Sequence, residues 1–258
     1  MTLRVALKIA YVGTSFHGYA RQPMVSTVEG TIIEKLIEKG IINNIKNAQI
    51  RCASRTDKQV SALTNIMTFY TAEEPENILF ILSNEFSHIF VYGITQVSES
   101  FNPRYALSRT YHYFLPKEKI PTDKLKHVLS LFVGKHNFTN FAKVESHRNP
   151  IRTIEKINII EENNFFKIEI TAQTFLWHQI RRILSAAIKY YKGKISFEQI
   201  HKALLYHEIP VDFNLAPAIP LVLSEIYYPT LTFHESYEKK KRKKVIDTVK
   251  QEVTNLVF

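Results

Sequence analysis

Two kinds of hydrophobic pattern alternate along the chain, one typical of strands and the other typical of helices. Residues 3–11 place apolar side chains at alternate positions, which predicts a strand. The segment STVE at Ser26–Glu29 matches a capping box, and the apolar residues after it recur at helical spacing. The same criteria predict further strands near residues 48–52, 66–71, 90–97, 110–115, 151–160, 165–173 and 220–228. They predict further helices near residues 77–87, after residue 123, and at residues 176–191 and 196–206.

The order of these elements predicts an α+β fold in two halves that join near residue 104. Many strands are separated by connections longer than a hairpin, so we expect a mixed sheet. We therefore divide the chain into an N-terminal half (residues 1–104), a C-terminal half (residues 105–233) and a basic tail (residues 234–258).

The charge of the chain is large but unevenly distributed. The sequence has 34 basic and 24 acidic side chains, which gives a net charge of +10. This sign favours an acidic partner, either nucleic acid or an anionic membrane. Six of the cations form the run Lys239–Lys244, and without these six the net charge is only +4. The run is typical of a solvated tail that could add phosphate contacts, and the valines at 245, 249 and 253 after it could form a helix.

Several classes of protein are disfavoured by what the sequence lacks. Cys52 is the only cysteine, so neither a disulfide within the chain nor a cysteine-based zinc site is possible, which suits a reducing cytosol. No apolar run approaches the ~20 residues that cross a bilayer, and the N-terminal segment is typical of a strand and not of a signal peptide. Glycine-rich nucleotide-binding patterns and the G-x-S-x-G pattern are also missing. We expect a soluble cytoplasmic protein without a membrane partner.

Aspartate is scarce, and Asp57 has the most unusual surroundings. Only four aspartates occur, at positions 57, 123, 212 and 247. This scarcity argues against a two-metal nuclease site, which needs several clustered carboxylates, although glutamates could contribute. Asp57 lies between Arg55 and Lys58 in a polar turn between two predicted strands. The pattern alone leaves two interpretations open: a solvated turn with a local ion pair, or a catalytic carboxylate beside an RNA backbone.

The segment FLWHQIRRILSAAIKYYKGK predicts an amphipathic helix with one arginine at the edge of its buried side. At ~100° per residue, Arg181 falls beside Ile188 at that edge, whereas Arg182 falls on the opposite side, where we expect solvent. A guanidinium at the rim of a core usually pairs with a carboxylate or phosphate, because burying it unpaired is costly. The alternative is that the side chain of Arg181 extends to water.

The predicted strand SRTYHYFLP carries aromatic side chains on both faces. Tyr111 and Tyr113 share one face, while His112 and Phe114 share the other. Tyr111 could pack within the fold or stack on a nucleobase, as aromatic side chains do in proteins that bind single-stranded RNA. The histidines show no spacing typical of a metal site, so we expect no bound metal.

These stretches, in this order, resemble the TruA family of tRNA pseudouridine synthases. ASRTDKQVSA at residues 53–62 resembles the catalytic motif of the family, and FNPRYALSRTYHYFL at residues 101–115 resembles its tyrosine motif. Further resemblance lies at residues 7–36, at GKHNFTNFAK (134–143) and at FLWHQIRRI (175–183). In total the similarity extends over about residues 5–228.

The resemblance implies a pseudouridine synthase fold, with two ferredoxin-like halves and a mixed, mainly antiparallel sheet around a basic cleft. It implies that Asp57 is the catalytic aspartate and that Arg181 pairs with it. It also implies that Tyr111 stacks on the target base and that Arg55 helps to displace the target nucleotide from its stack. Family members act as symmetric dimers in which one tRNA touches both subunits, so the expected partners are tRNA and a second copy of the chain.

The sequence departs from the family pattern close to the aspartate. Ser54 stands where the family commonly has glycine before Arg-Thr-Asp, and residues 58–61 read Lys-Gln-Val-Ser in place of Ala-Gly-Val-His. Tyr19 and Ala20 stand where bacterial members usually have Gly-Trp. These changes keep the aspartate but leave the shape of the loop, and hence the exact target uridine, open.

The implied reaction fits a chain without cofactor motifs. Pseudouridine formation breaks a glycosidic C–N bond and forms a C–C bond between the same sugar and base, so it needs no redox change, added group or cofactor. An ionised Asp57 is required near the C1′ carbon, and Arg181 would keep it charged. Asp57 could attack the sugar or first abstract a proton to give a glycal, and Tyr111 is the expected acceptor of the C5 proton.

We therefore expect an isomerase that acts on uridine in the anticodon stem-loop of tRNA. Two alternatives stay open. One is a non-catalytic RNA-binding module on the same scaffold, for which Asp57 would be dispensable. The other is a synthase of the same family that acts on another tRNA position.

Overall fold

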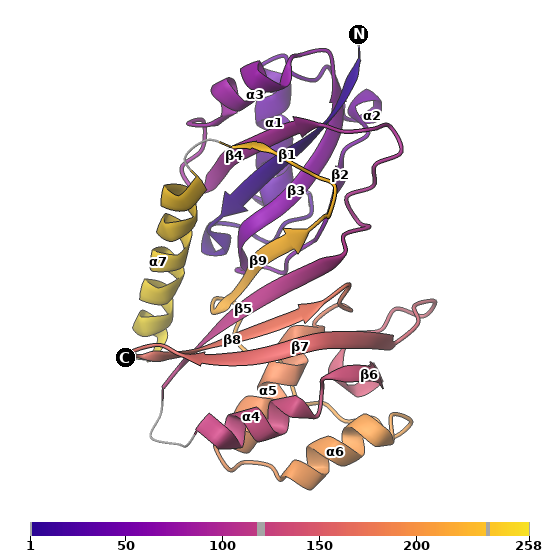
Figure 1. Cartoon of the computed structure of the whole chain (residues 1–258), viewed down its shortest axis with the longest axis vertical. Coiled ribbons are helices and arrows are strands. Elements are labelled where there is room, and N and C mark those ends of the chain that lie inside the picture. The colour runs from indigo at the N-terminus through magenta and orange to yellow at the C-terminus, as the bar shows by residue number, and fades with distance from the viewer. Residues whose placement is uncertain (1, 118–121, 236–237, 258) are drawn as a thin grey trace. The chain divides into compact units, whose positions relative to one another are not determined.

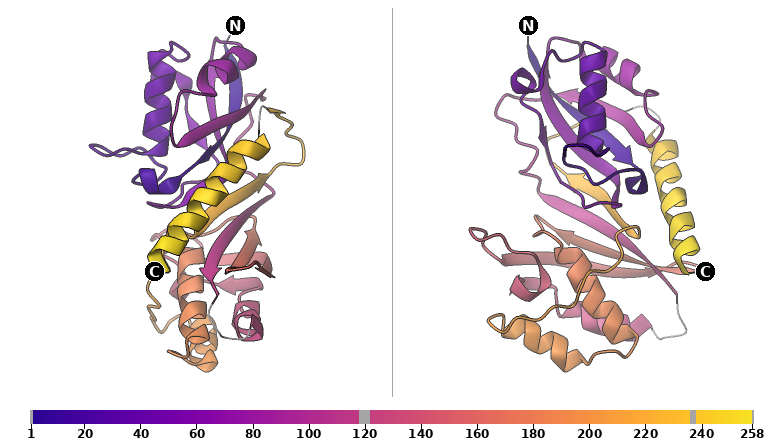
Figure 2. Two further views of the ribbon diagram at one scale, coloured as in Figure 1. Left: turned by 90° about the vertical axis from the view of Figure 1, so that its left-hand side faces the viewer. Right: turned by 180° about the vertical axis from the view of Figure 1, so that it is seen from behind.

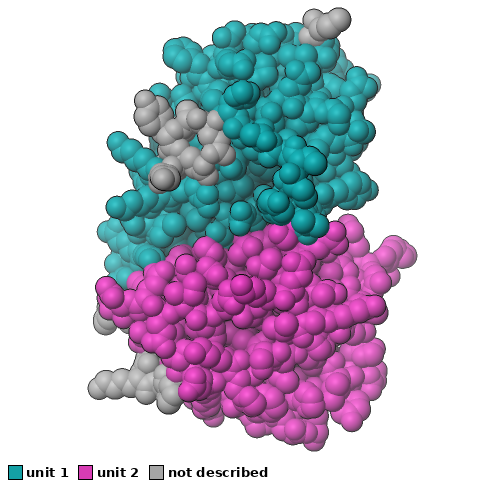
Figure 3. Space-filling view, in the orientation of Figure 1, with its two compact units in different colours: residues 1–107, 219–258 teal, residues 108–218 magenta. Residues whose placement is uncertain are grey.

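The structure is a computed structural model that describes residues 2–117, 122–235 and 238–257. Contacts within the chain divide it into two compact units, shown in separate colours in Figure 3. Unit 1 comprises Met1–Leu107 together with Ile219–Phe258, and unit 2 comprises Ser108–Ala218. Each unit has its own set of strands and helices (Figure 1).

The boundaries of the units differ from the expected division after residue 104. Unit 1 ends its first segment at Leu107, close to the expected position, but it also includes the C-terminal residues. The reason is that the strand at Leu221–Tyr227 pairs with a strand of unit 1, and the C-terminal helix packs on the sheet of unit 1. The basic tail is thus part of a folded unit.

The sheet of unit 1 has the strand order β10-β4-β1-β3-β9, and β2 also pairs with β3. Its strands are β1 (Leu3–Tyr11), β2 (Arg51–Cys52), β3 (Ser61–Thr71), β4 (Ile89–Gln96), β9 (Leu221–Tyr227) and β10 (His234–Glu235). All neighbours are antiparallel except β3 and β9, which run parallel. The expected mixed and mainly antiparallel sheet is therefore confirmed.

Unit 1 contains the element order of a ferredoxin-like unit. Its helices are α1 (Val28–Glu38), α2 (Ile45–Ala48) and α3 (Pro75–Leu82), with a short 3-10 helix η1 (Gly13–Ser15). The chain runs β1-α1-β2-β3-α3-β4, and these strands lie in the order β4-β1-β3-β2. The central strand β1 is buried on both sides, since Val5, Ala6 and Leu7 are all inaccessible to solvent. The right-hand view of Figure 2 shows α1 lying across this sheet.

Helix α1 begins one residue later than the capping-box pattern predicts. Its N-cap is Thr27, whose Oγ1 accepts a hydrogen bond from the amide of Gly30 at 3.2 Å. Ser26 instead offers its carbonyl to the amide of His17 at 2.8 Å, which ties it to the preceding loop. Glu29 does not complete the box either, because its carboxylate accepts from the amide of Arg21. The predicted cap at Ser26 is therefore wrong, although the helix itself is confirmed.

The C-terminal helix α7 (Glu238–Val257) is longer than the tail pattern suggested. Val245, Val249 and Val253 are buried, and α7 packs against β1, β3 and β4. Thr14 in η1 also donates a hydrogen bond to Glu252 at 2.6 Å. These valines, which recur at every fourth residue, thus form the apolar face of α7 that packs against the sheet of unit 1.

Unit 2 has an antiparallel sheet in the order β5-β8-β7-β6. Its elements are β5 (Ser108–Pro116), α4 (Thr122–Ser130), β6 (Gly134–Asn137), the 3-10 helix η2 (Thr139–Phe141), β7 (Ile151–Glu161), β8 (Phe165–Ala172), α5 (Gln179–Tyr191) and α6 (Phe197–Leu205). Alternate side chains of β8 are buried, as its alternating sequence requires. The sheet order β5-β8-β7 is the order of the first three strands in a ferredoxin-like unit, and β6 extends it.

The described residues contain no helix that is both long enough and apolar enough to cross a membrane.

Candidate active site

Asp57 lies in the loop of residues 53–60, which connects β2 to β3 in unit 1. Its side chain is half-buried, that of Arg55 is exposed, and Thr56 between them is buried. The amide of Val60 donates to the carbonyl of Asp57 at 3.1 Å, which closes a turn directly after the aspartate. The loop therefore presents the carboxylate of Asp57 and the guanidinium of Arg55 on either side of Thr56, whose buried side chain anchors the backbone.

Two buried polar side chains of the sheet hold this loop. The Tyr11 hydroxyl shares a hydrogen bond of 2.8 Å with Oγ1 of Thr56. Asn65 is fully buried on β3, donates from Nδ2 to the carbonyl of Ser54 at 2.8 Å and accepts from the Ser54 amide at 3.3 Å. Nδ2 of Asn65 also reaches the Tyr11 hydroxyl at 3.5 Å. Buried polar groups in such a network favour one loop conformation, because any other would leave them unsatisfied.

A second segment packs against the other side of the loop backbone. The amide of Tyr19 donates to the carbonyl of Thr56 at 3.1 Å. Gly18 has φ +99°, and a Cβ there would lie 3.3 Å from both the Thr56 carbonyl oxygen and the Lys58 amide. A side chain at Gly18 would be strained in its backbone and tight against the loop.

Gly13 makes the closest approach to the end of the loop. A Cβ at this position would lie 2.3 Å from the carbonyl carbon and oxygen of Val60. The Gly13 amide also donates to Oγ of Ser61 at 2.9 Å. Only glycine fits here without shifting the backbone that follows Asp57.

Gln59 adopts a left-handed conformation, with φ +68°. It is the position where the resemblance noted above expects glycine, which adopts this conformation without strain. A side chain with a Cβ is disfavoured there by about 1–2 kcal/mol. The substitution therefore keeps the turn of the loop but places strain two residues after Asp57.

Cys52 and Tyr19 lie next to the loop, and neither is prepared to ionise. Burial raises the pKa of the Cys52 thiol, and the Glu29 carboxylate raises it further, while the charge of Arg55 acts in the opposite direction. Burial likewise raises the pKa of the Tyr19 phenol well above its usual range. Asp57 is thus the candidate reactive group of this segment.

In unit 2, Tyr111 lies on β5 with its ring against Phe175. The two ring centroids are 5.4 Å apart and the rings are nearly perpendicular. Tyr111 is half-buried, whereas Tyr113 on the same face of the strand is buried. Burial raises the pKa of the Tyr113 phenol above its usual range, although the charge of Arg181 opposes this shift. The structure thus brings Arg181 to the face of β5 that carries Tyr111.

Arg181 is half-buried in the first turn of α5, where a loop carbonyl fixes it. Its Nε donates to the carbonyl of Ala216 at 2.9 Å, and the Ala216 amide donates back to the carbonyl of Arg181 at 3.0 Å. One turn later, Oγ of Ser185 donates to the carbonyl of Phe213 at 2.6 Å. The predicted apolar side of the helix, which includes Ile183, is buried.

Arg182 differs from its predicted solvent exposure. It is half-buried and forms an ion pair with Asp212, in which Nη1 lies 3.0 Å from Oδ1. The same carboxylate oxygen accepts from the amide of Asn214 at 2.8 Å. Sequence periodicity predicts that Arg182 faces solvent, but it does not predict the ion pair with Asp212.

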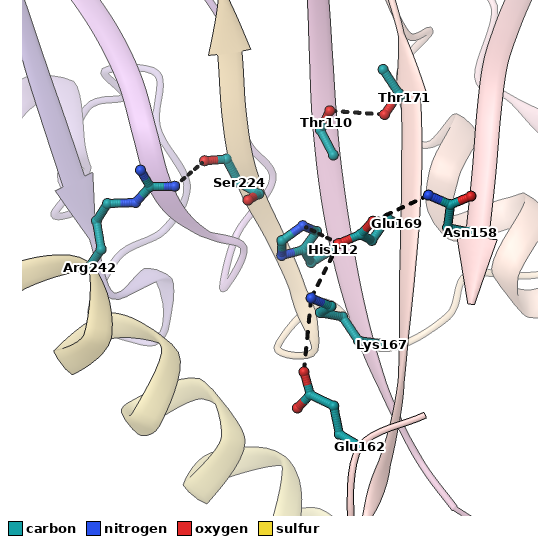
Figure 4. Close-up of polar contacts among 9 residues, drawn as sticks. All are labelled: Thr110, His112, Asn158, Glu162, Lys167, Glu169, Thr171, Ser224 and Arg242. Carbon is teal, nitrogen blue, oxygen red and sulfur yellow. Dashed lines mark hydrogen bonds and ion pairs between the residues drawn. The ribbon is translucent and has the colours of Figure 1, made fainter. Parts of the chain in front are cut away.

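A polar network of β5, β7 and β8 follows the other face of the unit 2 sheet (Figure 4). Nε2 of His112 lies 3.3 Å from Glu169, and Nζ of Lys167 lies 3.2 Å from the same carboxylate. Burial alone would raise the pKa of the Glu169 carboxyl, but the hydrogen bond from Lys167 and the charge of His112 outweigh it and lower the pKa. Asn158 completes the network at 3.5 Å. His112 is therefore held by a carboxylate on the sheet.

The predicted site residues fall on both units. Asp57 and Arg55 lie in unit 1, and Tyr111 and Arg181 lie in unit 2. Within unit 2, the charge of Arg181 acts on Tyr113, which shares a face of β5 with Tyr111. The pairing of Asp57 with Arg181 stays a prediction. Among the described residues, no group of three or more His, Cys, Asp or Glu side chains is arranged to hold a metal ion.

Sequence reasoning missed the residues that support the loop. Tyr11, Asn65 and Gly13 come from β1, β3 and η1, and none of them is adjacent to Asp57 in sequence. The available signal was Asn65, an amide side chain inside the mainly apolar stretch of residues 62–67. A buried amide in a strand needs partners, and here the partners are the loop.

Comparisons with known proteins identify the family of the chain. A family model described as tRNA pseudouridine synthase matches residues 128–229. The tRNA pseudouridine synthase A of Thermococcus kodakarensis is 36% identical over 256 residues, which cover 98% of this chain and 96% of the relative. The protein of the same name from Thermococcus sibiricus is 40% identical over 246 residues, covering 93% and 91% respectively.

A solved structure, the crystal structure of a Cbf5–Nop10–Gar1 complex, has 12% sequence identity and a TM-score of 0.32 over 76% of this chain and 44% of that chain. The assignment rests instead on the sequence relatives, which match nearly the full length of the chain. The chain therefore belongs to the TruA family of tRNA pseudouridine synthases, a family of isomerases.

Proposed function

We propose that this chain isomerises uridine to pseudouridine in the anticodon stem-loop of tRNA, with Asp57 as the catalytic carboxylate. The observation that carries this proposal is the loop around Asp57. Its backbone is fixed by Tyr11, Asn65 and the amide of Tyr19, while Asp57 itself is only half-buried. A catalytic group needs such a preorganised backbone together with access to substrate.

The proposed reaction rearranges atoms within one nucleotide. The bond between C1′ and N1 of uridine breaks, the base turns, and a bond forms between C1′ and C5. The proton on C5 then leaves and N1 gains a proton, so that the product is an isomer of uridine. For the acceptor of the C5 proton we propose the hydroxyl oxygen of Tyr111, which passes its own proton on to solvent. Asp57 acts at the sugar, either by attack on C1′ or by removal of a sugar proton to give a glycal. Both routes need an ionised carboxylate beside the ribose.

Three further side chains have proposed roles. Arg181 would pair with Asp57 and keep it ionised, for which a guanidinium suits because it remains charged at any relevant pH. Arg55 would occupy the space left when the target nucleotide leaves its stack. Its exposure next to Thr56 fits a group that meets RNA. The half-buried ring of Tyr111 would stack on the displaced base.

The proposed assembly is a homodimer that works in the cytoplasm on tRNA. The dimer follows from the family resemblance, in which one tRNA touches both subunits. A reducing compartment suits the single buried thiol of Cys52. Light scattering of the purified chain tests the dimer, and a monomeric mass at working concentration would contradict it.

Tritium release tests the proposed reaction. A tRNA transcript carrying uridine labelled with tritium at C5 should lose one label for each uridine converted. Absence of release from folded, tRNA-binding protein would favour a non-catalytic RNA-binding module. Mapping of modified uridines across a panel of transcripts then tests the position, and pseudouridine outside the anticodon arm would favour a synthase for another tRNA position.

A further inference from the structure

The N-terminal turns of α7 carry a cluster of cations that the proposed catalytic site does not use. Residues 239–244 read Lys-Lys-Lys-Arg-Lys-Lys, and they lie within the first turns of a helix that begins at Glu238. The left-hand view of Figure 2 turns this helix toward the reader. Lys240, Lys243 and Lys244 are exposed there, and we call these three side chains the α7 lysine cluster.

The fold of unit 1 fixes which side of α7 is available. Val245, Val249 and Val253 are buried against the sheet, so the apolar side of the helix is already covered. Arg242 donates from Nη2 to the carbonyl of Ser224 on β9 at 3.5 Å (Figure 4), so it faces inward. The lysine cluster lies on the turns that these contacts anchor, and its charges face solvent.

The position of these cations opposes the stability of the helix. The N-terminal end of a helix carries partial positive charge, so cations are unfavourable there and anions are favourable. Lys240 is three and four residues away from Lys243 and Lys244, which places like charges beside one another. Among the side chains that the structure describes, no carboxylate forms an ion pair with any member of the cluster. A feature that opposes local stability in this way is expected to serve binding.

Nζ of Lys244 lies 5.3 Å from the centre of the Phe90 ring. This contact holds one lysine of the cluster over β4. The helix that carries the cluster also packs on the sheet, so the three lysines keep a fixed backbone spacing along it. Rigid spacing reduces the entropy lost when a repeating polyanion binds.

We propose that the α7 lysine cluster binds the sugar–phosphate backbone of the substrate RNA. The inference rests on the proposed function for the identity of that RNA. A membrane surface is the less suitable polyanion, because amphipathic helices bind membranes through a free apolar side, and that side of α7 is buried in the sheet. RNA phosphates need only the exposed cations.

The test removes the three charges and measures the salt dependence of tRNA binding. The variant Lys240→Gln/Lys243→Gln/Lys244→Gln should bind tRNA about 10-fold or more weakly at low salt, and its plot of log K against log salt should be flatter by about 2. KM should rise by a similar factor, while kcat at saturating tRNA should stay within about twofold of wild type. The matched control is Lys126→Gln/Lys194→Gln/Lys202→Gln, which removes three exposed lysines from unit 2.

Stability separates lost binding from lost folding. Removing cations from the start of a helix should leave Tm unchanged or raise it by about 1–3 °C, so a weaker-binding variant with an undiminished Tm supports the proposal. Equal slopes for the α7 variant and wild type would overturn it. Equal losses in the α7 and control variants would also overturn it, because net charge alone would then explain them.

Two further outcomes separate this inference from the proposed function. If wild type releases no tritium but still loses RNA binding through the α7 variant, the proposed function fails and the inference stands. If wild type releases tritium and the α7 variant binds tRNA normally, only the inference fails. Vesicles of phosphatidylserine provide the membrane arm, and cluster-dependent binding to them that exceeds binding to tRNA would overturn the assignment to RNA.

Discussion

The loop that carries Asp57 and the helix that carries Arg181 are held in place by different means. The loop buries only Ala53 and Val60 among its apolar residues, and its backbone depends on Tyr11, Asn65 and the close approach of Gly13. Helix α5 instead buries a whole apolar side, and Arg181 needs only the Ala216 carbonyl to orient its Nε. The acid is thus positioned by a few irreplaceable contacts, and the cation by general packing. Substitutions around the loop should have larger effects than conservative ones around the helix.

The largest effect is expected at Gly13. Gly13→Ala forces a methyl group against the Val60 backbone, so it should lower the free energy of unfolding by about 3 kcal/mol and reduce kcat at temperatures where the variant is folded. Denaturant unfolding and single-turnover isomerisation measure the two effects. Gly193→Ala is the control, because Gly193 has φ +70° but no atom within 4 Å of its Cβ position. It should cost only about 1 kcal/mol, and a similar cost at both positions would contradict the account of the loop.

The next largest effect is expected at Arg181, and its neighbour Arg182 on α5 provides the comparison. Arg181→Lys should lower kcat by about 10²-fold, because lysine lacks the planar fork needed to hold Ala216 and a carboxylate together. Arg182→Lys should change kcat by less than about threefold, since its partner Asp212 is a largely exposed carboxylate and such pairs contribute little. Steady-state kinetics on a tRNA transcript measures both. Equal losses would show that Arg181 has no special partner.

A smaller effect is expected from the hydroxyl of Tyr11. Tyr11→Phe removes the bond to Thr56 and should lower the free energy of unfolding by about 1 kcal/mol, with a fall in kcat of about 10-fold. Tyr92→Phe is a matched control, because the buried Tyr92 hydroxyl donates to the Leu63 carbonyl at 2.8 Å, away from the loop. It should cause a similar loss of stability without the loss of kcat. If the two variants have the same kcat, Tyr11 does not position the loop.

The smallest effect is expected at Gln59. Gln59→Gly relieves the left-handed strain and should raise the free energy of unfolding by about 0.5–1 kcal/mol. Gln49→Gly should give a similar gain, because Gln49 also has a positive φ, of 44°, at the end of α2. Only the Gln59 variant should alter kcat, since only Gln59 lies in the loop. A destabilised Gln59→Gly variant, measured by thermal unfolding, would show that the turn is not strained.

Most of the regular structure was predictable from hydrophobic patterning. The bounds of β1 agree with the predicted strand, and each predicted helix exists, although α3 ends at Leu82 and not near residue 87. The errors have physical causes. β6 was missed because its four residues Gly134–Asn137 carry no apolar pattern. The first half of β3 was missed because Ser61, Thr64 and Asn65 are polar yet buried, with partners supplied by other segments.

The candidate site was predictable only as far as local motifs reach. The motif around Asp57 identifies the acid, but its supports come from Tyr11 and Asn65, which no local spacing connects with it. The spacing of three valines indicated the apolar face of α7, whereas the basic run before them did not indicate that the helix packs on the sheet. Long-range polar contacts of this kind depend on the tertiary fold and not on periodicity.

The most direct test of the central claim is the single-turnover rate of pseudouridine formation by Asp57→Ala, measured with tRNA affinity in the same preparation. The account predicts that the rate falls by more than about 10⁴-fold, while the Kd for tRNA stays within about threefold. Asp123→Ala, which changes an exposed aspartate at the start of α4, should keep the wild-type rate. An Asp57→Ala protein that still forms pseudouridine at a rate comparable to Asp123→Ala would contradict the account.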